Sequence, residues 1–324
     1  MILSDSWGRI FKYLRVSVTD RCNYRCKYCS PYGTYTHIDH TKILRYEDIL
    51  FVISVLAKYG LKKVRITGGE PLVRKGLAAF IKEVNDVPGI EEITITTNGS
   101  LLDRYGQELK EAGIKRVNIS LDSLQAEKYA YITGGFDLDK IIRNINVAKT
   151  LGFDPIKINA VIIKEFNDNE IIDFCDFAYQ TGTIVRFIEF MPVGNIEWNY
   201  ENVYPSDDIL KVISTTYGIT YLNNNSGPSK NYKLSNGATI GIISPITHHF
   251  CQTCDKLRLL ANGSIRPCLL MDYEIDLFDI IKKRDENELI TNLIDILKSK
   301  KKEHNLFQEG TSKNNGKPMS SIGG

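Results

Sequence analysis

Apolar residues recur along the first 190 residues in two alternating patterns. Runs rich in Val, Ile and Thr predict six β-strands, at residues 13–19, 62–69, 92–99, 115–123, 155–163 and 183–191. The segments between them carry apolar residues at helical spacing, as at 46–57 and 171–178. This alternation predicts an α/β fold with a parallel sheet and right-handed crossovers. Periodicity alone does not separate an open doubly wound sheet from a curved partial barrel.

The pattern changes after Pro192. The segment "YLNNNSGPSKNYKLSNGATIGII", residues 221–243, combines short strand signals with Asn, Gly and Ser turns and predicts an antiparallel hairpin region. A helical stretch is expected from about Asp276 to Lys300, and a polar, weakly patterned tail follows it. We therefore expect two parts, residues 1–190 and residues 191–324.

Polar and glycine-rich turns follow four of the predicted strands. They read "TGGEP", "TTNG", "SLDS" and "EFMPVG". Parallel sheets place their functional sites at the carboxyl ends of the strands. We therefore expect the active face to be built from these turns.

Composition narrows the class of protein. The chain has 324 residues, of which 43% are hydrophobic and 25% charged, as in soluble globular proteins. A formal net charge of +2 gives no reason to expect nucleic acid or a membrane as a partner. The N-terminus carries no export signal and the chain no run of about 18 apolar residues. We expect a soluble, cytoplasmic protein.

Cysteine usage gives the first indication of chemistry. Six of the seven cysteines form two triplets, which argues for metal binding rather than a disulfide framework. The first triplet is Cys22, Cys26 and Cys29, and the second is Cys251, Cys254 and Cys268. Three cysteines on a [4Fe–4S] cube leave one iron open to a small molecule, whereas four would close the cluster.

The sequence leaves zinc open as an alternative for each triplet. A zinc ion would need a fourth ligand, His37 or His40 for the first triplet and His248 or His249 for the second. The seventh cysteine, Cys175, lies on the apolar face of a predicted helix, where a buried free thiol is the ordinary case.

The first triplet, with Tyr28 inside it and "GGEP" at residues 68–71, resembles the signature of the radical S-adenosylmethionine (SAM) superfamily. Together with "VRITGGEPLVR", "VRFIEFMPVG", "FCQTCDKLRL" and the Gly323-Gly324 ending, it resembles the MoaA family of GTP 3′,8-cyclases, which act in molybdenum cofactor biosynthesis. The resemblance implies a partial (β/α)6 radical SAM barrel, with a C-terminal, antiparallel β-containing extension that carries a second [4Fe–4S] cluster.

The resemblance also implies a reaction. In that family the N-terminal cluster cleaves SAM and the C-terminal cluster binds the guanine of GTP. A 5′-deoxyadenosyl radical takes the ribose 3′ hydrogen, and the C3′ radical attacks C8 to give (8S)-3′,8-cyclo-7,8-dihydro-GTP. The enzyme class is a lyase, and the product passes to MoaC. An electron donor is required, and family members often form homodimers.

Family positions map onto single residues of this chain. SAM-contacting positions match Tyr28, Gly69, Ser120 and Met191. GTP-contacting positions match Arg15, Lys63, Arg65, Thr96, Lys157, Arg186, Lys256, Leu257 and Arg258, and Lys256 stands where the family usually has arginine. The Gly323-Gly324 tail is expected to enter the active site and assist GTP conversion. Independently of the resemblance, basic residues inside four apolar strands favour an anionic substrate, because buried charges need partners.

Two other functions remain as alternatives. A radical SAM enzyme that modifies a peptide would carry auxiliary clusters after a similar barrel, but usually with more C-terminal cysteines. A zinc or iron–sulfur sensor without turnover would not need basic residues inside the strands.

Overall fold

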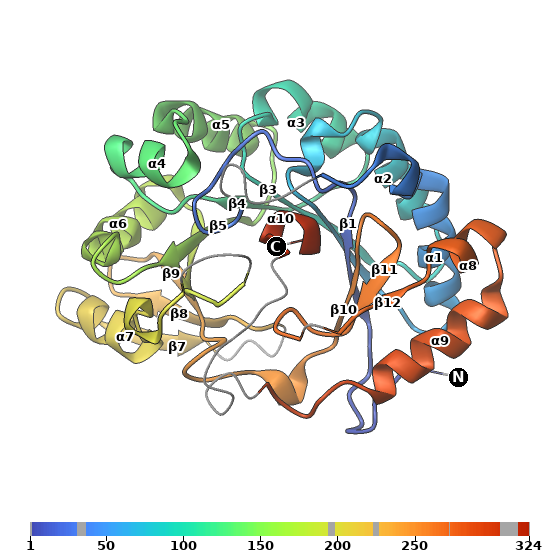
Figure 1. Ribbon diagram of the computed structural model, residues 1–324. Coiled ribbons are helices and arrows are strands. Elements are labelled where there is room, and N and C mark those ends of the chain that lie inside the picture. Colours follow the sequence, from blue (N-terminus) through green and yellow to red (C-terminus); the bar gives the residue numbers. More distant parts are fainter. Residues whose placement is uncertain are drawn as a thin grey trace.

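A single mixed sheet organises the molecule. The computed structural model describes residues 2–30, 37–193, 198–222, 227–271, 273–304 and 317–323. Within these residues the strands form one 12-stranded sheet, in the order β12-β11-β10-β1-β2-β3-β4-β5-β6-β9-β8-β7. Figure 1 shows the sheet curving around an interior, with most of the helices on its outer side.

The six predicted strands are confirmed, and they pair in parallel in chain order. They are β1 (Tyr13–Ser17), β2 (Lys63–Thr67), β3 (Glu92–Thr97), β4 (Val117–Ser120), β5 (Ile156–Ile162) and β6 (Ile184–Glu189). The helices that connect them are α1 (Tyr46–Lys58), α2 (Leu77–Asn85), α3 (Leu102–Glu111), α4 (Ala126–Thr133), α5 (Leu138–Thr150) and α6 (Ile171–Thr181). The arrangement is the expected partial barrel.

Buried apolar side chains alternate with polar and charged side chains along several barrel strands, among them β1, β2 and β5. In β1, Leu14 and Val16 are fully buried in the main hydrophobic core, while Tyr13 and Arg15 are half-buried. Because side chains alternate along a strand, Arg15 shares its face with Arg65 of β2 and Arg258 of β10, its register partners. The alternation therefore delivers charged side chains to the inside of the barrel.

The C-terminal part extends the sheet at both ends. At one end β9 (Thr239–Ile243) pairs in parallel with β6, followed by β8 (Lys230–Leu234) and β7 (Ile219–Leu222) in antiparallel order. At the other end β10 (Lys256–Leu259) pairs in parallel with β1 and leads to β11 (Ser264–Arg266) and β12 (Ile275–Asp276). The predicted hairpin region is confirmed. The sheet is continuous across residue 190, which directly follows β6.

The predicted helical stretch from Asp276 to Lys300 is two helices. These are α8 (Phe278–Lys283) and α9 (Glu286–Lys298). Arg284 ends α8 in a left-handed conformation with φ 58°, and the Asp285 side chain caps α9 by accepting a hydrogen bond from Glu288 N at 2.9 Å. A local cap therefore divides a segment that looks continuous by periodicity.

The remaining elements are short. Helix α7 (Ser206–Ser214) precedes β7, and 3-10 turns lie at His40–Lys42, Pro71–Val73, Asp168–Glu170, Tyr200–Asn202 and Cys251–Thr253. Helix α10 (Met319–Ile322) lies within the ring of strands, close to the C-terminal end of the chain (Figure 1). Among the described helices, none has the length and apolar character needed to cross a bilayer.

Candidate active site

The first cysteine triplet occupies the loop that follows β1. The main-chain N–H groups of Cys29 and Ser30 both donate to Cys26 O at 3.0 Å, which folds the loop into a turn. Burial raises the pKa of the Cys22 thiol to about 11, and burial followed by the charge of Cys22 raises that of Cys29 to about 12. The pKa of Cys26 is raised by burial and then by both other cysteines. Three thiols gathered in one loop, where burial outweighs the charge of the nearby Arg25, fit ligation of a positively charged iron–sulfur core.

The "GGEP" turn packs directly on this loop. Gly69 N donates to Thr19 O at 2.7 Å, and Glu70 N donates to Arg21 O at 2.8 Å. A Cβ at Gly69 would lie 2.3 Å from Arg21 O and 2.9 Å from Cys22 N. Glycine is therefore required here for close backbone approach between the end of β2 and the cysteine loop.

Glu70 is a structural member of the site that sequence reasoning did not single out, although it is the third residue of "GGEP". Its buried carboxylate accepts hydrogen bonds from Leu72 N at 3.0 Å, Thr97 Oγ1 at 2.8 Å and Asn98 N at 2.7 Å. Burial raises its pKa to about 7. Glu70 therefore ties the carboxyl end of β2 to that of β3.

Tyr28 is fixed by a second buried carboxylate, also missed at the sequence level although it lies in "SLDS". The Tyr28 hydroxyl donates to Asp122 Oδ2 at 2.6 Å, and Val161 N donates to Asp122 Oδ1 at 2.9 Å. Burial raises the pKa of Asp122 to about 6. Ser120, at the end of β4, lies two residues before Asp122.

The candidate SAM residues all lie at the carboxyl ends of strands or in the cysteine loop. Met191 follows β6 and packs on a small apolar cluster formed by Val193, Leu260 and Ile322. With Tyr28, Gly69 and Ser120, it therefore lies on the expected active face. All four positions lie at the edge of the sheet formed by the carboxyl ends of the strands. Their contacts with SAM stay a prediction.

A group of cations lines the inner face of the barrel: Arg15, Arg65, Lys157, Arg186 and Arg258. Burial first, and then neighbouring guanidinium groups, lower the pKa of Lys157 to about 8, that of Arg186 to about 9 and that of Arg15 well below its usual value. Burial also lowers the pKa of Arg258 to about 10. We call these five residues the cationic group.

Neutral partners hold members of the cationic group in place. Arg186 Nη2 donates to Asn118 Oδ1 at 2.7 Å and to Asn159 Oδ1 at 2.5 Å. Arg65 donates to Thr96 Oγ1 at 3.3 Å and to the Tyr13 hydroxyl. In the described part of the chain, no salt bridge joins Arg65, Lys157, Arg186 or Arg258 to a carboxylate. Oriented cations without carboxylate partners fit a polyanionic ligand.

Three other candidate GTP residues have different surroundings. Lys63 forms a salt bridge with Glu92 at 3.4 Å, and Lys256 one with Asp255 at 2.7 Å. The Leu257 side chain lies in the main hydrophobic core on the outer face of β10. Any contact of Leu257 with a ligand inside the barrel would therefore have to come from its main chain.

The second cysteine triplet borders the cationic group. Cys251 is the first residue of the 3-10 turn before β10, Cys254 directly follows that turn, and Cys268 follows β11. Burial raises the pKa of Cys251. Burial also acts to raise that of Cys254, but the ammonium groups of Lys300 and Lys256 lower it overall. The charges of Cys268 and Cys254 in turn act on Arg258. This places the second triplet beside the inner face.

The zinc alternatives find no support in the geometry. Over the described residues, no group of three or more His, Cys, Asp or Glu side chains is arranged to hold a single metal ion. The proposed histidine ligands have other partners: Asp20 for His37 at 3.1 Å, Arg21 for His40 at 2.7 Å, Asp207 for His248 at 2.9 Å and Glu303 for His249 at 3.6 Å.

The C-terminal tail spans the region between the two triplets. Met319 N donates to Cys29 O at 3.1 Å, and Arg258 donates to Gly323 O at the other end of α10. A Cβ at Gly323 would lie 2.6 Å from Thr67 Oγ1 and 3.2 Å from Ser17 Cβ. Gly324 lies outside the described residues. The described part of the tail thus enters the barrel at the carboxyl ends of β1 and β2.

Comparisons with known proteins define the class. A model of the radical SAM superfamily matches residues 16–178, and the Molybdenum Cofactor Synthesis C model matches residues 183–306. The chain belongs to the radical SAM superfamily. It is 43% identical over 323 residues to the GTP 3′,8-cyclase of Petrotoga mobilis, covering 99% of both chains, and 42% identical to that of Peptoclostridium acidaminophilum, covering 94% of both. Within the superfamily it belongs to the GTP 3′,8-cyclase family.

Solved structures agree on the fold. Streptococcus suis SuiB bound to S-adenosylmethionine superposes with a TM-score of 0.61 at 17% identity, covering 86% of this chain and 64% of SuiB. The enzyme anSMEcpe with bound AdoMet superposes with a TM-score of 0.58 at 15% identity, covering 86% of this chain and 78% of that structure. At these identities the likeness concerns the radical SAM fold.

Proposed function

We propose that this protein is a radical SAM lyase that converts GTP to (8S)-3′,8-cyclo-7,8-dihydroguanosine 5′-triphosphate, the first step of molybdenum cofactor biosynthesis. Full-length identity of about 40% to curated GTP 3′,8-cyclases supports the reaction. The observation that carries it is the placement of the cationic group beside the second cysteine triplet, with α10 reaching from there to the first.

The cationic group would bind the triphosphate. GTP carries about four negative charges at neutral pH, and such a ligand needs several fixed cations when water is removed. Arg186, held by Asn118 and Asn159, presents a guanidinium of fixed orientation. Arg15, Arg65 and Lys157 lie close enough to Arg186 for their charges to affect one another. A bound triphosphate would relieve this repulsion, so binding and charge neutralisation act together.

The cysteine triplets would hold two [4Fe–4S] clusters. Cys22, Cys26 and Cys29 would hold the N-terminal cluster, with Tyr28, Gly69, Ser120 and Met191 placed around SAM. Cys251, Cys254 and Cys268 would hold the C-terminal cluster, whose open iron would meet the guanine. The bound cofactors would supply the 5′-deoxyadenosyl radical that takes hydrogen from the ribose.

The chain's own contribution is positioning and exclusion of water. Radicals are quenched by stray donors, so the interior must be closed during turnover. The apolar cluster of Val193, Leu260 and Ile322, with Met191 and Met319 packed on it, lies beside the first triplet and lines this region with hydrophobic side chains. The tail helix α10 contributes two of these residues and reaches Arg258, so it would cover SAM and substrate together.

The product would pass to MoaC, and reducing equivalents would come from an electron donor. Family membership supports both assignments. Homodimer formation, which is frequent in the family, stays an expectation.

Anaerobic reconstitution tests the function. About eight irons and eight sulfides per chain are expected for two cubes. Incubation with GTP, SAM and dithionite should yield 5′-deoxyadenosine together with the cyclised nucleotide. Stoichiometric zinc without iron would refute the assignment, and SAM cleavage that does not depend on GTP would favour a peptide substrate.

A further inference from the structure

Lys300 is a buried lysine next to the second cysteine triplet. It lies two residues after the end of α9 and is 3% exposed. Its ammonium nitrogen lies 3.6 Å from Cys254 Sγ, 3.2 Å from Lys256 O and 4.5 Å from the centre of the Phe11 ring. Throughout the described ranges, no carboxylate forms a salt bridge with it.

Burial of an ammonium group is costly unless an anion compensates it. The neighbouring Lys298 shows the ordinary alternative, since its side chain is 63% exposed and pairs with Asp295 at 3.2 Å. Lys300 instead has a backbone carbonyl, an aromatic face and the Cys254 sulfur. Of these three groups, only a thiolate carries a full negative charge. A thiolate at Cys254, the form that ligates a cluster, would therefore compensate the charge of Lys300.

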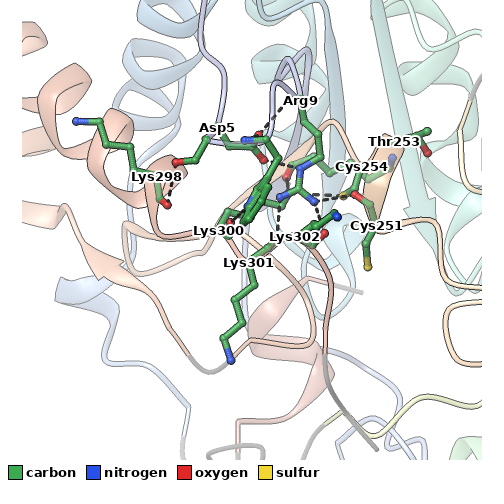
Figure 2. Close-up of polar contacts among 12 residues, drawn as sticks. Asp5, Arg9, Cys251, Thr253, Cys254, Lys298, Lys300, Lys301 and Lys302 are labelled. Carbon is green, nitrogen blue, oxygen red and sulfur yellow. Dashed lines mark hydrogen bonds and ion pairs between the residues drawn. The ribbon is translucent and has the colours of Figure 1, made fainter. Parts of the chain in front are cut away.

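The main chain around Lys300 is fixed by a buried arginine. Arg9 donates to Lys301 O at 2.8 Å, to Lys302 O at 3.0 Å and to Cys251 O at 2.7 Å. Figure 2 shows the Arg9 guanidinium between the lysine segment and the Cys251 loop. Asp5 pairs with Arg9 Nε at 2.5 Å. One side chain thus ties the N-terminal segment, the lysine segment and the triplet together.

A further contact positions Lys300 itself. Trp7 Nε1 donates to Lys300 O at 3.0 Å. The lysine is therefore held by its own carbonyl and by the two residues that follow it, and its ammonium reaches Cys254 from a backbone with little freedom. The backbone of Lys300 is thus fixed by hydrogen bonds and its side chain is buried, whereas a surface lysine is usually exposed and free to change conformation.

We propose that Lys300 donates a hydrogen bond to the Cys254 thiolate that ligates the C-terminal [4Fe–4S] cluster, and that its charge raises the reduction potential of this cluster. The inference rests on the proposed function, which assigns a cluster to the second triplet. Hydrogen bonds to the sulfurs and net charge are among the factors that set cluster potentials. Reduction adds an electron to a centre that already carries three thiolates, so a nearby ammonium stabilises the reduced form more than the oxidised form.

Lys300 is a positioning residue in this account, because it acts through Cys254. The C-terminal cluster would then accept an electron more readily, while its open iron stays free for the substrate. Lys300 lies in the sequence run "KSKKKEH", where the pattern indicates only a solvated charged segment. Burial separates Lys300 from Lys298, Lys301 and Lys302, which are exposed.

The test compares full-length variants that carry only the C-terminal cluster. Replacing Cys22, Cys26 and Cys29 by alanine removes the other signal and should leave about four irons per chain. In this background, Lys300→Met keeps the length of the side chain and removes the charge. We expect the equilibrium constant for cluster reduction to fall at least tenfold, which corresponds to about 59 mV for a one-electron couple. An anaerobic redox titration followed by electron paramagnetic resonance measures it.

Lys298→Met is the matched control, because it removes the same charge two residues away from an exposed position. The reduction potential of the Lys298→Met variant should equal that of the parent. Lys300→Arg, which keeps the charge, should have a potential close to that of the parent. If Lys300→Met fails to fold, Lys300→Gln takes its place. A loaded cluster with an unchanged potential in the Lys300 variant overturns the inference and leaves the proposed function intact. A parent that binds no cluster refutes the second cluster itself, and the inference with it.

Discussion

The guanidinium of Arg258 donates a hydrogen bond to the main-chain carbonyl of Gly323. Arg258 belongs to the cationic group. Gly323 ends α10, and at the start of this helix Met319 N donates a hydrogen bond to Cys29 O. The tail is therefore connected at one end to the proposed GTP cations and at the other to the first cysteine triplet. Displacing the tail should affect use of the substrate more than loading of the cluster.

Gly323→Ala is expected to suppress GTP cyclisation while SAM cleavage persists. The added Cβ would lie 2.6 Å from Thr67 Oγ1, and Gly323 has φ 79°, a conformation that alanine rarely adopts. Both effects push the carbonyl away from Arg258. Chromatography of 5′-deoxyadenosine and of the cyclised nucleotide from one reaction gives the ratio of the two products, which should fall by about tenfold or more, since ~1.4 kcal/mol suffices for that change.

Gly135→Ala serves as control for this variant. Gly135 also has a positive φ, 100°, but no atom lies within 4 Å of its added Cβ. Gly135→Ala therefore has the cost of a positive φ but no steric clash of the added Cβ. Normal product ratios in both variants would show that the position of the tail does not matter.

Gly69→Ala is expected to displace the first cysteine loop. An added Cβ would lie 2.3 Å from Arg21 O, which is backbone and cannot rotate away. Overpacking of this kind typically costs about 1–3 kcal/mol. Iron content after reconstitution should fall from about eight toward about four per chain, with the C-terminal cluster retained. Gly218→Ala, whose nearest contact would be an ordinary 3.5 Å, should reconstitute fully; full loading of Gly69→Ala would contradict this role for the turn.

Local patterns predicted the six strands well, because each strand carries its own periodicity. The partial barrel itself was expected only from the family resemblance. The six strands of the barrel lie within the predicted segments. The parallel pairing of β9 with β6 and of β10 with β1 was not predicted, because it depends on contacts between residues far apart in the sequence. The break at Arg284 was also missed, since apolar spacing continues through it.

The site was predictable where a residue's chemistry is distinctive. Cysteine triplets and arginines inside strands stand out in a sequence. Glu70 and Asp122 did not, because their roles come from burial against partners in other strands. Lys300 was hidden for the same reason, since only its tertiary surroundings distinguish it from its neighbours. Alternation along β10 could have shown that Leu257 faces the opposite way from Lys256 and Arg258.

Arg186→Met is expected to weaken GTP binding by about 10- to 100-fold, because a hydrogen-bonded charge contributes about 1.5–3 kcal/mol. The free protein should lose no stability, since relief from a buried charge beside other cations offsets the loss of two hydrogen bonds to Asn118 and Asn159. Anaerobic calorimetry with GTP and thermal denaturation without it measure the two quantities. Arg143→Met, at a position 67% exposed, is the control. A lower melting temperature of Arg186→Met with unchanged GTP affinity would assign Arg186 a structural role.

GTP affinity should fall as the pH rises through about 8, because burial and the charges of Arg186, Arg116 and Arg65 lower the pKa of Lys157 to about 8, with Glu92 acting in the opposite direction. The ammonium is largely present at pH 7 and lost above 8, so the dissociation constant should rise by up to about tenfold per pH unit. The stability of the free protein changes in the opposite direction. It rises with pH between about 8 and the usual lysine pKa of 10.5, because over this range the unfolded chain binds more protons at Lys157 than the folded chain does. Titrations with GTP from pH 7 to 8.5 measure the affinity. Lys157→Arg, which keeps its charge, should flatten the profile, and an equally steep profile in Lys157→Arg would assign the pH dependence to another group.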